Sequence, residues 1–126
     1  MDTTAVQTRF RGIDIATANM DEMVKFYREV FQVEFDEIVH GDWRLYRGEL
    51  AGMNFLLAPS EPSGTDESTP GVHQFHLAVE DLPEFVERVR SLGYRVESAN
   101  FGPEENYCVR DADGHPWIVG QNSDGI

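Results

Sequence analysis

The stretch IDIA at residues 13–16 has a counterpart in FHLA at residues 75–78, an offset of 62 positions (from 13 to 75). In each stretch side chains of different polarity alternate, which is typical of a half-buried β-strand. The same offset pairs identical residues further along the chain: Glu22 with Glu84, Val24 with Val86 and Arg28 with Arg90. A repeat of this length predicts that the fold is built from two copies of one unit.

A helix is expected after each of these strands. Asn19 is placed to cap the first helix and Asp81 the second, and each is followed three residues later by a glutamate, as in a capping box. Apolar residues then recur at spacings of three and four, which gives each helix one apolar face. Gly93 ends the second helix.

Three further strands are expected after each helix. In the first copy they cover residues 33–40, 43–47 and 53–58, and in the second copy residues 94–99, 107–110 and 116–121, after starting strands at 10–17 and 75–79. The chain therefore predicts one domain, residues 1–126, with module one at about 8–58, an exposed linker at 59–71 and module two at about 72–121. Each module reads βαβββ.

Composition excludes several classes of function. The 126 residues carry a formal net charge of -13 and a single cysteine, Cys108. Such a charge repels phosphate backbones and anionic membranes, so neither nucleic acid nor a membrane is an expected partner. The absence of a leader, of a long apolar run and of a second cysteine predicts a soluble, cytoplasmic protein whose thiol is buried and inert.

Three motifs carry a resemblance to a known family. The last hairpin reads RDADGHPWIV at residues 110–119, FY stands at 26–27 late in the first helix, and VEDL stands at 79–82 between strand and helix. In this order and spacing they resemble the glyoxalase/bleomycin-resistance/dioxygenase (vicinal-oxygen-chelate) superfamily. The resemblance implies an α+β fold in which two tandem βαβββ modules form a curved mixed sheet around a concave cavity, and it implies a homodimer.

The resemblance also implies where a metal would bind. In the family's metal enzymes, each module gives one ligand from its first strand, usually histidine, and one from its last strand, usually glutamate. Those positions fall here on Gly12 and Gln74 in the first strands and on Leu56 and Ile118 in the last strands. Glycine and aliphatic side chains offer no lone pair and one glutamine is a poor anchor, so we predict no metal at this site and no cofactor.

Strand alternation predicts which polar side chains share the cavity with these positions. Asp14 and His76 have the right phase and are equivalent under the 62-residue offset. A carboxylate beside an imidazole could act as a general acid and base, which makes the pair the candidate catalytic residues. Hydrogen-bonded pocket lining is the plainer alternative for both. Asn54 and Gln74 are further candidates for ligand binding, and Asn54 could instead satisfy the backbone at a strand end.

Four aromatic residues could form a flat wall for a ring-bearing ligand. They are Trp43, Tyr46, Tyr107 and Trp117, and core packing is the alternative for each.

Three hypotheses for function follow. The first is a metal-independent protein that binds a small, partly apolar or aromatic molecule in the concave sheet, either to sequester it or as an enzyme of unassigned reaction. The second is a metal-dependent lyase, isomerase or dioxygenase with displaced ligands such as Asp14 and His76. The third is an interaction subunit whose cavity is vestigial.

Overall fold

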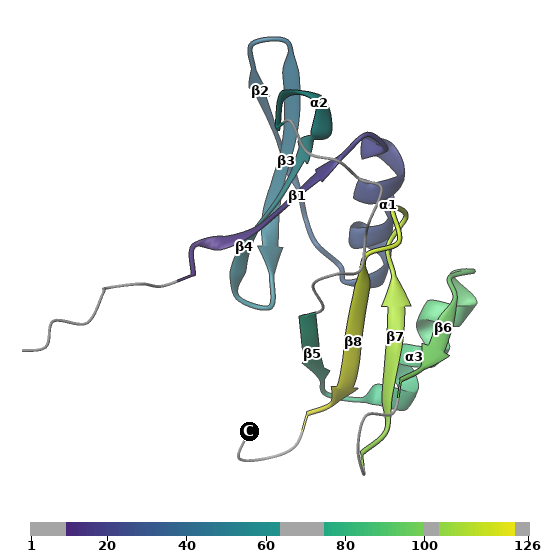
Figure 1. Ribbon diagram of the computed structural model, residues 1–126. Helices are drawn as coiled ribbons and strands as arrows, with labels where there is room; N and C mark the ends of the chain where they lie inside the picture. Colours follow the sequence, from purple (N-terminus) through teal and green to yellow (C-terminus); the bar gives the residue numbers. More distant parts are fainter. Residues whose placement is uncertain (1–9, 64–74, 100–103, 123–126) are drawn as a thin grey trace, which may run out of the picture.

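The computed structural model of the chain describes residues 10–63, 75–99 and 104–122. Its elements are β1 (Gly12–Thr17), α1 (Met20–Val30), β2 (Asp36–His40), β3 (Trp43–Leu50), β4 (Met53–Pro59), α2 (Ser60–Ser63), β5 (Phe75–Val79), α3 (Leu82–Ser91), β6 (Val96–Ser98), β7 (Asn106–Arg110) and β8 (Pro116–Gln121). Figure 1 shows them as two sheets with the helices beside them. The predicted α+β class and the two tandem βαβββ modules are confirmed.

Each module contributes one four-stranded mixed sheet. Sheet A has the strand order β1-β4-β3-β2 and sheet B the order β5-β8-β7-β6, so the two topologies are the same. The first and last strands of each module are parallel, and the other pairs are antiparallel. Gly12 pairs with Asn54 and Phe75 pairs with Trp117, which is the same separation along the chain in both modules. The offset of 62 residues therefore describes the first strand, the helix and the last strand of each module, because α1 and α3 also begin 62 positions apart, at Met20 and Leu82. Strands β3 and β7 are offset by 61, since Asn54 pairs with Glu49 and Pro116 pairs with Arg110.

The helix ends follow the sequence signals in one module and depart from them in the other. Asp81 caps α3 as predicted, because its side chain accepts a hydrogen bond from the Glu84 N–H at 3.1 Å. Gly93 has φ +92° and ends α3 in the left-handed conformation that favours glycine. Asn19 occupies the N-cap position of α1, but its side chain makes no capping hydrogen bond. Its N–H instead donates to Thr17 Oγ1 at 2.9 Å.

Strand β3 is longer than expected because it runs through Gly48, which the sequence pattern assigns to a turn. A Cβ at this position would lie 2.5 Å from Val33 Cγ1 and 2.6 Å from the Glu34 carbonyl oxygen. Glycine is therefore needed here inside a strand, where the chain leading into β2 crosses close to β3. A second difference is α2, a single helical turn at the start of the predicted linker at 59–71. The rest of that linker lies outside the described residues.

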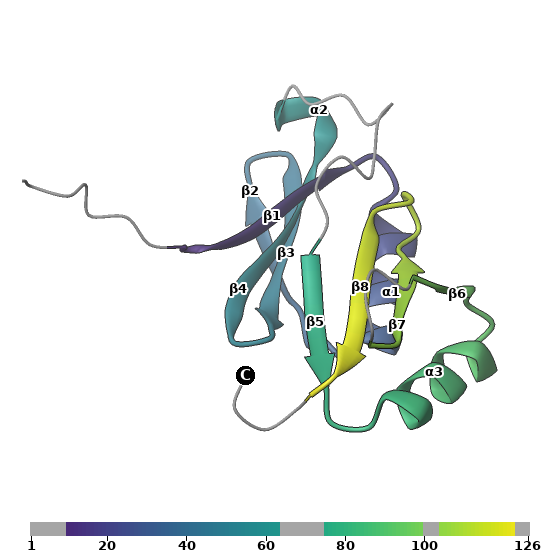
Figure 2. The same cartoon turned by 60° about the horizontal axis from the view of Figure 1, so that its bottom comes forward.

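One hydrophobic core joins the two modules. Helix α1 packs on β4 of its own module, and Figure 2 shows it behind β7 and β8, so its side chains also reach the sheet of module two. Tyr27 lies between the sheets, with ring centroids 4.6 Å from Phe55 on β4 and 6.0 Å from Trp117 on β8. Phe31 stacks on Phe85 of α3 at 5.9 Å. Because these contacts cross between modules, neither sheet is packed independently of the other.

Arg88 of α3 strengthens this junction at the C-terminus of α1. Its two terminal nitrogens donate to the carbonyl oxygens of Glu29 and Val30, at 2.8 and 2.7 Å. The last carbonyls of a helix have no partner within the helix, and a cation there also complements the helix dipole. The guanidinium lies 5.6 Å from the ring centroid of Phe85. A side chain of module two thus completes a helix of module one.

Within the described part of the chain, no helix is long and apolar enough to cross a membrane.

Candidate functional site

Strand register divides each sheet into two faces. Side chains that are paired across strands share a face, and neighbours along a strand alternate. One face of each sheet packs on the helices and is here called the core face. It carries Ile13, Ile15, Phe55 and Leu57 in sheet A and Phe75, Leu77, Trp117 and Val119 in sheet B. The other is here called the open face, and it carries Gly12, Asp14, Asn54 and Leu56 in sheet A and His76, Ala78, Ile118 and Gly120 in sheet B.

The positions that the family uses for metal ligands lie on the open faces. Gly12 and Leu56 are on sheet A, and Ile118 is on sheet B, where it is only 4% exposed. Gln74 lies outside the described residues. Leu56 pairs with Asp14 and Ile118 pairs with His76, so the two modules place equivalent aliphatic residues beside equivalent polar ones.

Gly12 has no room for a side chain. A Cβ there would lie 2.5 Å from the carbonyl oxygen of Asn54 and 2.8 Å from its Cβ. Real Cβ atoms do not approach backbone this closely, so a histidine at this position would require β1 and β4 to move apart. Asn54 reinforces the close pairing, because its side-chain nitrogen donates to the Arg11 carbonyl oxygen at 3.2 Å. Asn54 therefore satisfies the backbone at the strand end.

The donor set does not fit the family's metal ion. Glycine, leucine and isoleucine cannot coordinate a cation through their side chains. Among the residues that the structure describes, no group of three or more His, Cys, Asp or Glu side chains is placed to hold a metal. The open faces therefore lack the converging imidazoles and carboxylates that the family's metal enzymes use.

The structure does not bring the two candidate catalytic residues together. Asp14 and His76 are both exposed on their open faces. Within the described ranges, no hydrogen bond or ion pair joins them. An acid and base pair would need such a contact, or one bridging water, in a single chain.

His76 has a different polar neighbour, which the sequence reasoning missed. A Cβ on Gly120 would collide with Asn106 Oδ1 and lie 3.2 Å from His76 Nε2, so both polar atoms lie over this glycine. Asn106 is buried, with 8% of its surface exposed. Its side-chain nitrogen donates to the Glu104 carbonyl oxygen at 3.4 Å. The only sequence signal was the place of Asn106 directly before a predicted strand, which is too common to single out a residue.

The aromatic candidates do not form one wall. Trp43 has the phase of the open face of sheet A, because it lies an even number of residues before Arg47, which pairs with Leu56 on that face. Tyr46 lies on the core face, where it pairs with Leu57. The Tyr46 hydroxyl donates to Glu37 Oε2 at 2.9 Å. Tyr107 also has the phase of the core face, opposite Val119. Trp117 is 1% exposed and belongs to the core.

Trp43 and Tyr46 meet at a pocket at one end of sheet A, here called the end pocket. It has a volume of about 500 Å³ and lies between the β1–α1 connection, the β2–β3 turn and the start of α2. Gly41 has φ +63° in that turn, the left-handed conformation that two-residue hairpins require. The aromatic side chains of this pocket were candidates from the sequence, whereas its acidic rim was not.

The residues that carry the family resemblance form a buried network. Tyr27 of the FY motif donates to Asp111 Oδ2 at 2.5 Å, although the two are 84 positions apart. Trp117 Nε1 donates to the Tyr27 hydroxyl at 2.8 Å. Asp111 Oδ1 accepts from the N–H groups of Asp113 and His115, at 3.0 and 2.9 Å. These motif residues therefore hold the last hairpin onto α1 rather than line a binding surface.

Burial raises the pKa of the Tyr27 hydroxyl in this network and of the Cys108 thiol on β7. Burial and, after it, the negative charge of Asp111 raise the pKa of Tyr27 well above 10.0, so its hydroxyl keeps the proton that it donates. Burial likewise raises the pKa of Cys108, although Arg110 opposes it. A thiol with a raised pKa is a weak nucleophile, in line with the inert cysteine that the sequence predicts.

Three solved structures have the same fold at low sequence identity. The antibiotic-binding protein TnmS3 from Streptomyces sp. CB03234 is 16% identical, with a TM-score of 0.74 over 95% of this chain and 100% of its own. The fosfomycin resistance protein FosX from Listeria monocytogenes, complexed with Mn(II) and sulfate, is 12% identical, with a TM-score of 0.73 over 94% and 96%. A lactoylglutathione lyase from Agrobacterium tumefaciens is 23% identical, with a TM-score of 0.67 over 92% and 95%.

Sequence comparison supplies the family. No curated protein sequence matches the chain. The sequence model of the Glyoxalase/Bleomycin resistance protein/Dioxygenase superfamily, however, matches residues 9–119, nearly the whole chain. The chain belongs to this superfamily.

Proposed function

We propose that this protein binds a small, partly apolar or ring-bearing organic molecule on the open faces of its sheets, without a metal at the family's usual position. The observation that carries the proposal is Gly12, where a side chain of any kind would collide with Asn54. Ile118 is almost fully buried, but Leu56 is only half-buried on the open face of sheet A and offers apolar contact together with the exposed hydrogen-bonding side chains of Asp14 and His76. Sites for small organic ligands commonly have this make-up.

The relatives support binding without fixing the chemistry. TnmS3 is an antibiotic-binding protein, whereas FosX is a resistance protein solved with Mn(II), so one fold serves proteins of different chemistry. Function in such a family depends on the residues at the site and not on the fold. Asp14, Gln74 and His76 are the residues we assign to orienting the ligand on the open faces, and Asn54 joins them through its side-chain oxygen, since its nitrogen bonds to Arg11. Trp43, which has the phase of the open face, stays a candidate for aromatic contact, whereas Tyr46 and Tyr107 have the phase of the core faces.

A neutral fluorescent dye tests the proposal. N-phenyl-1-naphthylamine should bind the native protein, and Leu56→Glu should weaken this binding by about tenfold because it places a charge on the open face. Leu92→Glu is the matched control, since it makes the same substitution at an exposed site at the end of α3. It should change the affinity by less than about twofold. An equal loss of dye binding in both variants would contradict the proposal. If the native protein does not bind the dye at all, the proposal is also contradicted, and an interaction subunit with a vestigial cavity is favoured.

A metal titration separates the enzyme alternative. Calorimetry with Mn²⁺, Zn²⁺, Ni²⁺ and Fe²⁺ should give no stoichiometric binding to the protein as purified. Stoichiometric binding that disappears in His76→Ala would instead favour a metal-dependent enzyme with displaced ligands. Because Asp14 and His76 make no contact within the described part of one chain, that alternative needs further ligands, and a second subunit is the source we propose for them.

The proposal includes a cytoplasmic homodimer. Phe10 and Val39 are 80% and 63% exposed, and they give a second subunit apolar surface to cover. Light scattering coupled to gel filtration should return twice the mass of one chain. A monomer at micromolar concentration would remove this part of the proposal and leave ligand binding untouched.

A further inference from the structure

The end pocket is distinct from the open faces. Thr17 and Tyr46, which line it, have the core-face phase of sheet A, and Met20 and Asp21 come from the first turn of α1. The pocket therefore lies around the end of the sheet, toward α1. Its volume of about 500 Å³ is within the range of sites that hold small organic molecules.

Aromatic and apolar side chains form part of the pocket wall. Trp43 and Tyr46 line it together with Met20. Tyr46 is fixed in place by the hydrogen bond from its hydroxyl to Glu37 and by its edge-to-face contact with Phe35 at 6.3 Å. Rings held in this way offer a large contact area at little entropic cost, and their faces attract cations.

The charges around the pocket are mostly negative. Asp21, Asp42 and Glu61 line it, and Arg44 is the single cation among the lining residues. Arg44 lies 3.7 Å from Glu37 Oε2, so its charge is already partly balanced. Across the described ranges of the chain, none of the three lining carboxylates forms an ion pair. A concave surface with this balance concentrates cations and repels anions.

The negative charges near the pocket contribute to the raised pKa of the Tyr46 phenol. Its pKa is raised first by the hydrogen bond to Glu37 and then by burial, and the negative charges of Glu37 and Asp21 raise it further while Arg44 opposes them. The carboxylates thus act at the aromatic wall as well as at the rim.

We propose that the end pocket is a second binding site that takes a small organic cation with an aromatic ring, such as a tertiary or quaternary arylalkyl ammonium. The ring packs against Trp43 and Tyr46, and the ammonium group lies among the carboxylates of Asp21, Asp42 and Glu61. An uncharged ring lacks the second interaction and an anion is repelled. The site does not depend on ligand binding at the open faces.

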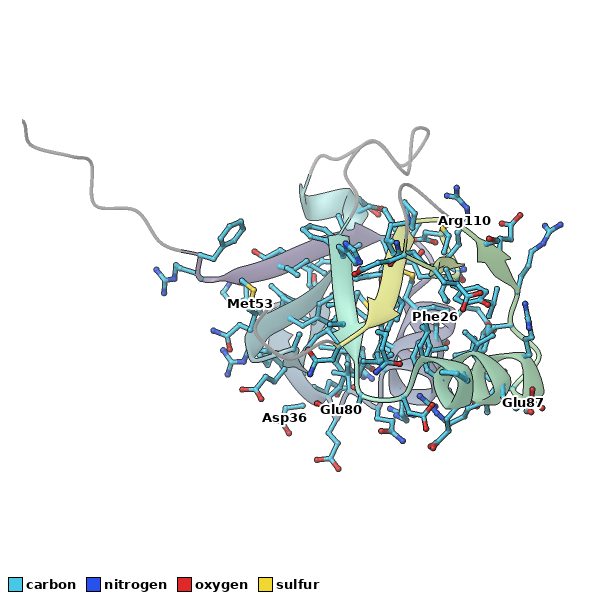
Figure 3. The ribbon with its side chains drawn as sticks, turned by 90° about the horizontal axis from the view of Figure 1, so that it is seen from below. Phe26, Asp36, Met53, Glu80, Glu87 and Arg110 are labelled. Atoms are coloured by element: carbon cyan, nitrogen blue, oxygen red, sulfur yellow. The ribbon has the colours of Figure 1, made fainter. Side chains whose placement is uncertain are left out.

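Benzyltrimethylammonium is a suitable probe, and calorimetry or ligand-observed NMR can follow its binding to the full chain. The double variant Asp42→Asn/Glu61→Gln should weaken binding by about tenfold. The matched control is Glu84→Gln/Glu87→Gln on α3, which removes the same two charges from exposed sites of the other module. Figure 3 shows Glu87 at the rim of the molecule away from α2. The control should change the affinity by less than about twofold.

Further measurements complete the test. Trp43→Ala should weaken binding of the cation by about fivefold. Benzyl alcohol and benzenesulfonate should bind at least about tenfold more weakly than the cation. Equal losses in the pocket variant and the α3 control would mean that the cation senses only the overall charge of -13, and would overturn the proposal, as would no binding at all. Thermal unfolding of each variant confirms that it is folded.

The two proposals fail separately. His76→Ala should leave binding of benzyltrimethylammonium unchanged, whereas Asp42→Asn/Glu61→Gln should leave binding of the neutral dye unchanged. If the pocket variant instead weakens both probes equally, the end pocket is part of the open-face site and the inference of a second site is wrong.

Discussion

Asp111 of module two takes the place in its sheet that the apolar Leu50 holds in module one, since Leu50 pairs with Met53 and the Asp111 N–H donates to the carbonyl oxygen of His115, 62 positions after Met53. Glu49, which is 62 positions before Asp111 in the sequence, pairs instead with Asn54 on the open face, so the surroundings of these two acids are opposite. Glu49 is exposed, whereas the side chain of Asp111 is fully buried and accepts hydrogen bonds from Tyr27 and from two backbone N–H groups. Ala58 and Gly120 are equivalent in strand register, and at Gly120 two polar side chains occupy the space in which Ala58 has its Cβ. The comparison teaches that duplication preserved the backbone plan while module two took on the polar contacts that hold the two modules together.

The largest loss of stability is expected for a substitution of Asp111. Asp111→Ala leaves the Tyr27 hydroxyl and two backbone donors without their acceptor in a buried place, so we expect a loss of about 4 kcal/mol in the free energy of unfolding. Glu49→Ala, the same substitution at an exposed acidic residue of module one, should cost less than about 0.5 kcal/mol. Urea unfolding followed by tryptophan fluorescence measures both. Similar losses in the two variants would show that the modules are not specialised in this way.

An intermediate loss of stability is expected for a substitution of Gly120. Gly120→Ala drives a Cβ into Asn106 Oδ1, so we expect about 2 kcal/mol of destabilisation from overpacking. The same change made in an Asn106→Ala background should cost clearly less, because the colliding atom is gone and the two effects are not additive. Ala58→Gly should cost about 1 kcal/mol or less, from backbone entropy alone. Additive losses in the double variant would place the strain elsewhere.

The smallest effect concerns pH. The raised pKa of Tyr27 means that the folded state keeps this proton where the unfolded state, with a pKa near 10.0, releases it. The stabilisation is complete below that value and is lost as pH rises toward the folded pKa. Tyr27→Phe should therefore cost about 1 kcal/mol at neutral pH and show a shallower fall in stability between about pH 9 and pH 11.

Tyr46→Phe is the control for this pH dependence. Its phenol donates to Glu37 at an exposed site, so removing it should alter the alkaline fall in stability much less. Tyr94, whose pKa is raised to about 12 by burial and then by its hydrogen bond to Glu29, keeps some dependence in every variant. An unchanged alkaline fall in Tyr27→Phe would contradict the assignment of this effect to Tyr27.

The sequence was a good guide wherever the signal is local. The periodicity of side chains, the cap at Asp81 and the stop at Gly93 depend on residues a few positions apart, and they place α3 and the strands β5 and β8 at their observed bounds. The same reasoning wrongly placed Gly48 in a turn, because glycine is common in turns. Nothing nearby in sequence indicates that the segment containing Val33 and Glu34 crosses close to it. The strand phases that put Gly12, Leu56 and Ile118 on one face of their sheets also followed from alternation alone.

Sequence by itself determined the duplicated βαβββ plan, the family and the loss of the family's metal-ligand residues, because each of these is written in residue type and spacing. Only the tertiary structure decided that side chains of α1 reach Trp117 of module two, that Tyr27 meets Asp111, that Asn106 lies beside His76, and that Trp43 and Tyr46 meet at a pocket with an acidic rim. The reason is that these contacts join segments far apart in the chain. Their geometry is set by how helices and sheets pack, which no local pattern of side chains specifies.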